Sequence, residues 1–142
     1  MTIAGNIDLS RVDVIALQKA LTPRLTKYIP FQPTPKQSAF LLMNDVKEIL
    51  YGGSAGGGKS VAQLMGALQF VDIPGYSAIL FRKTYADLAL PGALIDMSKQ
   101  WLMPFVESKE VKWSEKEKKY TFPSGATLSF GYLESPNDCY RY

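Results

Sequence analysis

Residues 46–71 read VKEILYGGSAGGGKSVAQLMGALQFV, and three patterns follow one another in this stretch. The run at 46–51 is rich in residues that favour strands and predicts a strand. Residues 52–58 contain only glycine, serine and alanine. Apolar residues then recur at positions 61, 64, 65, 68 and 71, which is the spacing of one helix face. A strand, a glycine-rich loop and a helix in this order predict an α/β fold.

The glycine-rich loop, residues 53–60, matches the pattern G-x-x-x-x-G-K-[ST] at every fixed position. Chance alone produces this pattern in roughly one sequence in two hundred of this length. Small residues let successive backbone N–H groups turn inward as an anion nest, and the following helix adds the positive end of its dipole. The Lys59 ammonium reaches the β- and γ-phosphates of a nucleotide, and the Ser60 hydroxyl is a ligand for Mg²⁺.

The motif therefore predicts ATP and Mg²⁺ as cofactors, with Lys59 as a catalytic residue and Ser60 as the metal ligand. The predicted nucleotide-binding residues of the loop are Gly53, Ser54, Ala55, Gly56, Gly57, Gly58, Lys59, Ser60 and Val61. The alternative is a glycine-rich turn without a ligand. A dinucleotide fingerprint is excluded, because Lys-Ser follows the third glycine and no acidic residue closes the next strand.

The composition excludes several other kinds of chemistry. The chain has 142 residues, about one domain, with 46% hydrophobic and 20% charged residues, as in an ordinary globular protein. It contains no histidine, which excludes Ser-His-Asp and Cys-His catalysis and histidine metal ligands. A single cysteine, Cys139, excludes an intrachain disulfide. With neither a membrane span nor a signal peptide in the sequence, we expect a soluble cytoplasmic protein with no membrane partner.

Upstream of the loop, the sequence predicts a short first unit, residues 1–33. Residues 8–21 read as a helix, in which Ser10 and Asp13 have capping-box spacing. Prolines in residues 23–35 predict an extended arm that ends this unit. A second helix begins after Thr34, so we assign residues 34–142 to the domain that contains the glycine-rich loop.

Gln37 has two interpretations. Its side-chain amide offers a donor and an acceptor, which suits the edge of an adenine base, and several P-loop motor families use a glutamine at this place. However, Thr34 and Gln37 also have capping-box spacing, so Gln37 is equally explained as a helix cap.

Downstream of the loop, residues 76–82 predict a buried strand. Thr84 opens a helix that is interrupted near Pro91 and runs to about residue 103. Residues 107–119 contain five lysines and four glutamates, which predict a solvated loop or sheet edge. The alternating pattern on either side of Pro123-Ser124-Gly125 predicts an antiparallel hairpin.

Two cations end the predicted strand at residues 76–82. Arg82 and Lys83 lie at the strand end that faces the ligand crevice in open α/β sheets. They are explained equally well as contacts to phosphate or DNA and as solvated charges. The aromatic residues Tyr76, Tyr85, Trp101 and Trp113 are interpreted as packing residues rather than base-stacking ones.

Four motifs together resemble the ATPase portion of phage terminase large subunits. In order, they are P-x-P-x-Q in residues 33–37, the loop YGGSAGGGKS in residues 51–60, ILFRKT in residues 79–84, and FPSGATLSF in residues 122–130. The resemblance covers about residues 30–142. It implies a partial P-loop ATPase domain in an enzyme that couples ATP hydrolysis to the translocation of double-stranded DNA into a procapsid.

The resemblance also implies partners and further site residues. The expected partners are double-stranded DNA, the portal protein, the small terminase subunit and other copies of the chain. Gln37 takes the place of the adenine reader, and Arg141 that of an arginine that reaches a neighbouring subunit's nucleotide. Unlike many members, the chain has no arginine within the loop, where Ser54 and Ala55 stand.

Two features of the family pattern are missing from these 142 residues. No hydrophobic strand ending in Asp-Glu follows the loop, and there is no nuclease domain. The family also places later strands between the two predicted here. We therefore expect a truncated chain with exposed strand edges that binds nucleotide weakly and hydrolyses little. The alternatives are another P-loop ATPase, such as a helicase, and a non-catalytic nucleotide-binding fragment.

Overall fold

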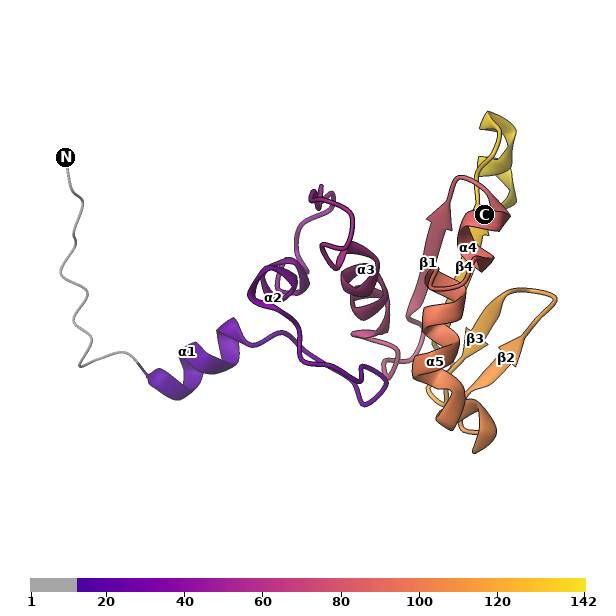
Figure 1. Cartoon of the computed structure of the whole chain (residues 1–142). Helices are drawn as coiled ribbons and strands as arrows, with labels where there is room; N and C mark the ends of the chain where they lie inside the picture. The colour runs from indigo at the N-terminus through magenta and orange to yellow at the C-terminus, as the bar shows by residue number, and fades with distance from the viewer. Residues whose placement is uncertain (1–12) are drawn as a thin grey trace.

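A computed structural model describes residues 13–142 (Figure 1). It confirms a mixed α/β architecture with a four-stranded mixed sheet. No helix within this part of the chain is long and apolar enough to cross a bilayer. The elements are α1 (Val14–Leu21), α2 (Pro35–Leu41), α3 (Lys59–Leu68), β1 (Ser77–Arg82), α4 (Tyr85–Ala89), α5 (Leu94–Glu107), β2 (Lys112–Ser114), β3 (Lys119–Thr121), β4 (Thr127–Tyr132) and the 3-10 helix η2 (Pro136–Arg141).

The strands lie in the order β1-β4-β3-β2. β1 runs parallel to β4, whereas β4, β3 and β2 pair antiparallel. The predicted hairpin is confirmed as β3 and β4, with Gly125 at a φ of +86° in the turn between them. β2 is an edge strand inside the charged segment 107–119, where Trp113 lies opposite Tyr120. The prediction that this charged segment forms a solvated loop or a sheet edge is therefore confirmed for β2, which is an edge strand.

Threonine caps begin two of the predicted helices. Thr34 accepts from the backbone N–H of Gln37, and Thr84 accepts from that of Asp87, and both capping boxes are complete. The interruption near Pro91 separates α4 from α5, which continues to Glu107 with Pro104 inside it. At α1 the cap is Asp13, while the predicted partner Ser10 and the first turn at 8–12 lie outside the described residues.

The hydrophobic core lies between the sheet and the helices. Leu128 and Phe130 of β4 and Tyr120 of β3 are buried together with Leu102 of α5 and Leu68 of α3. In Figure 1, α5 crosses in front of the sheet, and α3 lies beside the outer strand β1. This arrangement holds the start of α3 near the end of β1, which is the region of the glycine-rich loop.

The strand at residues 76–82 is not buried as predicted. Ala78 and Leu80 pack against the core, but Ile79 and Phe81 on the other face are 41% and 36% exposed. The described helices cover only one face of this strand, and β1 is the outer strand of the sheet. An edge strand with one covered face alternates in burial, because successive side chains point to opposite faces.

The predicted strand at residues 46–51 is wrong, because these residues form no strand in the structure. A groove of about 430 Å³ is lined by Ile49 of this segment and by residues of β1, among them Ile79. A strand requires a neighbour for its backbone N–H and C=O groups, and none of the described strands pairs with this segment.

Side chains of α2 hold the end of this segment instead. The ring of Tyr51 packs edge-on against that of Phe40, with 5.3 Å between ring centroids. The Lys36 ammonium donates to the carbonyl of Gly52 at 2.8 Å. The entry to the glycine-rich loop is thus positioned by a helix rather than by a sheet.

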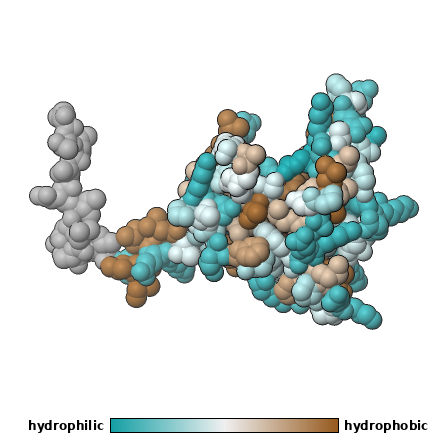
Figure 2. All heavy atoms as spheres, viewed as in Figure 1, coloured by the Kyte–Doolittle hydropathy of each residue, from teal (hydrophilic) through white to brown (hydrophobic). Residues whose placement is uncertain are grey.

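The proline-rich arm packs along the body of the domain. Tyr28 and Ile29 are buried, and the Tyr28 hydroxyl donates to Glu110 at 2.8 Å. The Arg24 guanidinium makes two hydrogen bonds to Asp72, at 2.7 and 2.6 Å. By contrast, α1 has no buried residue and displays exposed apolar side chains at the left of the body (Figure 2).

Candidate functional site

The glycine-rich loop curls around a cavity at the N-terminus of α3. The cavity measures about 400 Å³. Gly56 and Gly58 adopt left-handed φ values of +79° and +74°, which only glycine takes readily. The lining residues are Ala55, Gly56, Gly57, Gly58, Lys59, Ser60 and Val61 from the loop and α3, together with Gly92 and Met97. The last two were not predicted, and no local sequence signal marks them.

The first turn of α3 faces this cavity with its backbone donors uncapped. Gly58 is the N-cap residue and, being glycine, has no side chain that could accept from the first-turn N–H groups. These donors and the positive end of the helix dipole favour an anion. The loop and the helix together make a concave surface suited to negatively charged oxygen atoms.

The Lys59 side chain closes one side of the loop. Its ammonium donates to the carbonyls of Gly53 and Ser54, at 2.7 and 2.6 Å. Both contacts are exposed, so the ammonium can exchange these carbonyls for another acceptor at little desolvation cost. In this position Lys59 places a positive charge beside the cavity that it helps to line.

Ser60 lies at the start of α3 and contacts the end of β1. Its hydroxyl accepts a hydrogen bond from Arg82 Nη2 at 3.2 Å. The other guanidinium nitrogen, Nη1, donates to the side chain of Gln63 at 3.1 Å. The sequence leaves two interpretations open for Arg82, and the structure brings this residue to the glycine-rich loop.

Gln37 caps α2 and binds the loop at the same time. It is buried, and its carbonyl oxygen accepts from the backbone N–H of Thr34 at 2.9 Å. Its amide nitrogen donates to the carbonyl of Gly58 at 3.1 Å. The capping interpretation describes the observed bonds, and contact with an adenine would require Gln37 to exchange one of these partners.

Arg141 lies outside the lining of this cavity. It is the last residue of η2, where it donates to the Tyr132 hydroxyl at 3.2 Å and pairs with Asp138 at 3.2 Å. The pKa of Asp138 is lowered, and the largest cause is the hydrogen bond that its carboxylate accepts from the backbone N–H of Ser135. Arg141 is thus exposed, on the segment that follows β4.

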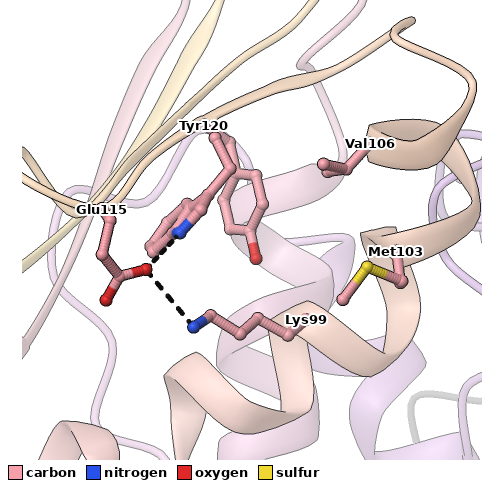
Figure 3. A pocket seen from close by; sticks show the side chains of 6 residues that line it. Lys99, Met103, Val106, Glu115 and Tyr120 are labelled. Carbon is pink, nitrogen blue, oxygen red and sulfur yellow. Dashed lines mark hydrogen bonds and ion pairs between the residues drawn. The ribbon is translucent and has the colours of Figure 1, made fainter.

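A second cavity lies between α5 and the β2–β3 edge (Figure 3). Glu115 accepts from the Trp113 indole and pairs with Lys99 and Lys118. The hydrogen bond from Lys118, followed by that from Trp113, lowers the pKa of Glu115 to about 2. The charged and polar groups of this cavity bind one another. We therefore interpret the cavity as part of the packing of β2 and β3 against α5.

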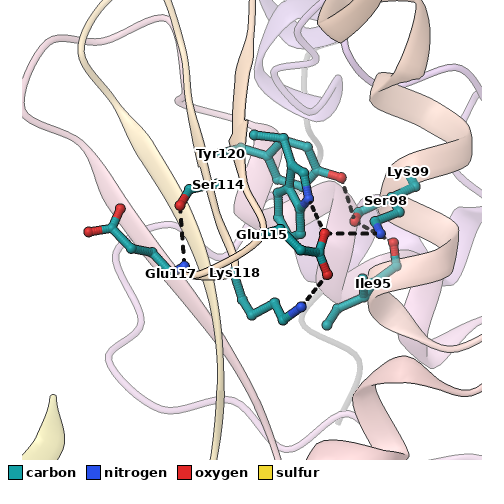
Figure 4. A network of polar contacts seen from close by, with 9 residues as sticks. Ile95, Ser98, Lys99, Ser114, Glu115, Glu117, Lys118 and Tyr120 are labelled. Carbon is teal, nitrogen blue, oxygen red and sulfur yellow. Dashed lines mark hydrogen bonds and ion pairs between the residues drawn. The ribbon is translucent and has the colours of Figure 1, made fainter.

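Hydrogen bonds extend this packing into the core (Figure 4). The Ser98 hydroxyl lies 3.1 Å from that of Tyr120, and burial raises the pKa of Tyr120 to about 12. Trp113 packs on Tyr120 with 4.3 Å between ring centroids, and Trp101 is buried. The prediction that these tryptophans are packing residues agrees with these contacts.

The residues of the loop fit a bound phosphate chain with Mg²⁺. A Cβ atom at Gly58 would lie 2.7 Å from the Gln37 amide nitrogen and would stand at a φ of +74°, so a side chain is disfavoured there. Within residues 13–142 no cluster of three acidic, cysteine or histidine side chains could hold a metal ion. A Mg²⁺ ion at Ser60 would therefore take most of its ligands from phosphate and water, as is usual for this ion.

Comparison with models of protein families, with curated proteins and with solved structures gave no match to this chain.

Proposed function

We propose that the chain binds ATP with Mg²⁺ in the glycine-rich loop and forms the nucleotide-binding part of an ATPase. The observation that carries this proposal is the coincidence of a complete G-x-x-x-x-G-K-[ST] motif with a concave loop at a helix N-terminus. Either feature alone is weaker, because glycine-rich turns and uncapped helix ends both occur without ligands.

Each residue of the loop has a defined role in this proposal. The backbone N–H groups of the loop and of the first turn of α3 donate to the phosphate oxygens. The Lys59 ammonium leaves the carbonyls of Gly53 and Ser54 for the terminal phosphates and holds them in line. The Ser60 hydroxyl is the protein ligand for Mg²⁺. When bound, this ion neutralises charge on the phosphate oxygens.

The larger assembly that we propose is a viral DNA-packaging motor of the terminase type. It rests on the four sequence motifs that resemble, in the same order, those of terminase large subunits. In that setting the partners are double-stranded DNA, a portal protein, a small terminase subunit and further copies of the chain. A net charge of +3 does not by itself require a DNA partner.

One observation favours a second candidate, nucleotide binding without hydrolysis. The described residues that line the cavity include no aspartate or glutamate. Hydrolysis of ATP requires a group that orients the attacking water, and this role commonly falls to a polar or acidic side chain. In this second candidate, the chain binds nucleotide and does not hydrolyse it.

The test is the binding of a fluorescent ATP analogue with Mg²⁺ to wild type, Lys59→Ala and Lys83→Ala. We expect Lys59→Ala to weaken binding about tenfold or more, because it removes a charged contact to phosphate. Lys83 is exposed and is absent from the cavity lining, so its variant is the charge-matched control. Absence of binding, or binding that does not depend on Lys59, would refute the proposal.

Phosphate release measured on the same samples separates the two candidates. Steady turnover that is lost in Lys59→Ala supports an ATPase, whereas binding without release supports a nucleotide-binding unit. The motor proposal has its own readout, the binding of a short DNA duplex with and without a non-hydrolysable ATP analogue. If the affinity for the duplex is the same with and without the ATP analogue, this result would count against a packaging motor.

A further inference from the structure

Arg82 contacts Ser60, the residue that we propose as the protein ligand for Mg²⁺. It is the last residue of β1, and its Nη2 donates to the Ser60 hydroxyl at 3.2 Å. Its Nη1 donates to the Gln63 side chain at 3.1 Å and to the carbonyl of Phe81 at 3.2 Å. Every partner of this guanidinium is uncharged, and no ion pair of the described residues includes it.

The Ser60 oxygen cannot serve Arg82 and a divalent cation equally well. The Ser60 hydroxyl oxygen has two lone pairs, so coordination of Mg²⁺ occupies one of them and leaves at most one to accept from Arg82. Two positive groups on one oxygen repel each other at a distance of a few ångströms. We therefore expect an arriving metal ion to displace the guanidinium from this oxygen, whereas in the metal-free chain the guanidinium stays there.

We propose that Arg82 supplies the positive charge at Ser60 in the metal-free state and yields this place to Mg²⁺ when the metal enters with the nucleotide. This inference rests on the proposed binding of nucleotide in the loop. Arg82 then compensates for missing metal, so the chain holds a nucleoside triphosphate even without Mg²⁺. After displacement, the guanidinium remains beside the cavity as a donor for the terminal phosphate.

The competing explanation is purely structural. The bonds to Gln63 and Ser60 also join β1 to the first two turns of α3, and such a link stabilises the fold whether or not nucleotide binds. Loss of this link alone would lower the melting temperature and would weaken nucleotide binding by the same factor with and without metal. The dependence on metal therefore distinguishes the two explanations.

The experiment compares wild type, Arg82→Gln, Arg82→Lys and the control Lys83→Gln. The affinity for a fluorescent ATP analogue is measured once with excess Mg²⁺ and once with EDTA, and melting curves are recorded for each variant. We expect Arg82→Gln to weaken binding about tenfold in EDTA and no more than about twofold in Mg²⁺. Arg82→Lys keeps the charge and should lie between wild type and Arg82→Gln. Lys83→Gln should match wild type in both buffers.

The outcomes distinguish failure of this inference from failure of the proposed function. If Arg82→Gln weakens nucleotide binding equally in both buffers, or does not weaken it in EDTA, the role proposed for Arg82 is overturned. The proposal that the chain binds nucleotide is unaffected by either result. Wild type that binds no nucleotide in either buffer overturns the proposed function and this inference together. If Arg82→Gln does not fold, Arg82→Lys takes its place. The affinity of this variant in Mg²⁺ is divided by its affinity in EDTA, and a ratio equal to that of wild type refutes the role proposed for Arg82.

Discussion

The side-chain amide of Gln37 donates a hydrogen bond to the carbonyl of Gly58, with 3.1 Å between the two atoms. The donor belongs to the first turn of α2, and the acceptor is the N-cap residue of α3. Residues 21 positions apart in the chain are thereby joined at the glycine-rich loop. A buried polar side chain thus anchors the glycine-rich loop at Gly58.

Gln37→Ala should lower the free energy of unfolding by about 1–2 kcal/mol. The change removes one half of the capping box of α2 and the bond to Gly58. Chemical denaturation measures this loss, with Gln32→Ala as a control at an exposed position of the arm. The same variant tests the adenine interpretation. A selective loss of ATP over GTP binding would show that Gln37 reads the base, whereas an equal loss would show that it only positions the loop.

Gly58→Ala should destabilise the chain by about 1–3 kcal/mol. The φ of +74° disfavours a side chain, and the new Cβ would lie 2.7 Å from the Gln37 amide nitrogen. Gly52→Ala is the matched control, because nothing lies within 4 Å of its Cβ position. Adding Gln37→Ala removes the clash but not the backbone strain. Thermal melting that shows Gly58→Ala and Gly52→Ala equally stable would contradict this description of the loop.

Tyr28→Ala should lower the free energy of unfolding by about 3–5 kcal/mol, as expected for removal of a large buried side chain. Tyr28 is buried between the rings of Phe105 and Phe122, at centroid distances of 4.7 and 5.0 Å. Phe31, which is exposed, provides the control Phe31→Ala. A loss below about 1 kcal/mol in urea denaturation would mean that the arm does not contribute to the folded body.

Acidification should weaken the packing of β2 and β3 on α5 through Glu115, which lies in the turn between these strands. Hydrogen bonds from Lys118 and Trp113 lower the pKa of this carboxyl from 4.5 to about 2. A lowered pKa in the folded state means that the contribution to stability is present above pH 4.5 and is lost as the pH falls towards 2. The effect is small, because Glu115 is exposed and solvent screens its charge.

Fluorescence-detected unfolding at a series of pH values measures this dependence, with Trp113 as a reporter near the carboxyl. Glu115→Gln should flatten the loss of stability in this range, whereas Glu117→Gln on the same turn should not. An unchanged slope in Glu115→Gln would show that other carboxyls govern the acid response.

Much of the local structure was predictable from the sequence. The caps at Thr34 and Thr84, the break before α5 and the hairpin around Gly125 all depend on residues within a few positions of each other. The motif of the glycine-rich loop is local in the same sense, since its spacing specifies which backbone donors and which side chains stand at the helix start.

The sequence by itself thus determined the starts of α2 and α4, the tight turn at Gly125 and the glycine-rich motif, because short-range hydrogen bonds and backbone conformation decide these features. Only the tertiary structure decided that residues 46–51 form no strand, that one face of β1 is exposed, and that Arg82 reaches Ser60. These features depend on which distant segment supplies a partner. A strand without a neighbour does not form, and a cation at a strand end contacts whichever acceptor the packing of α3 brings to it.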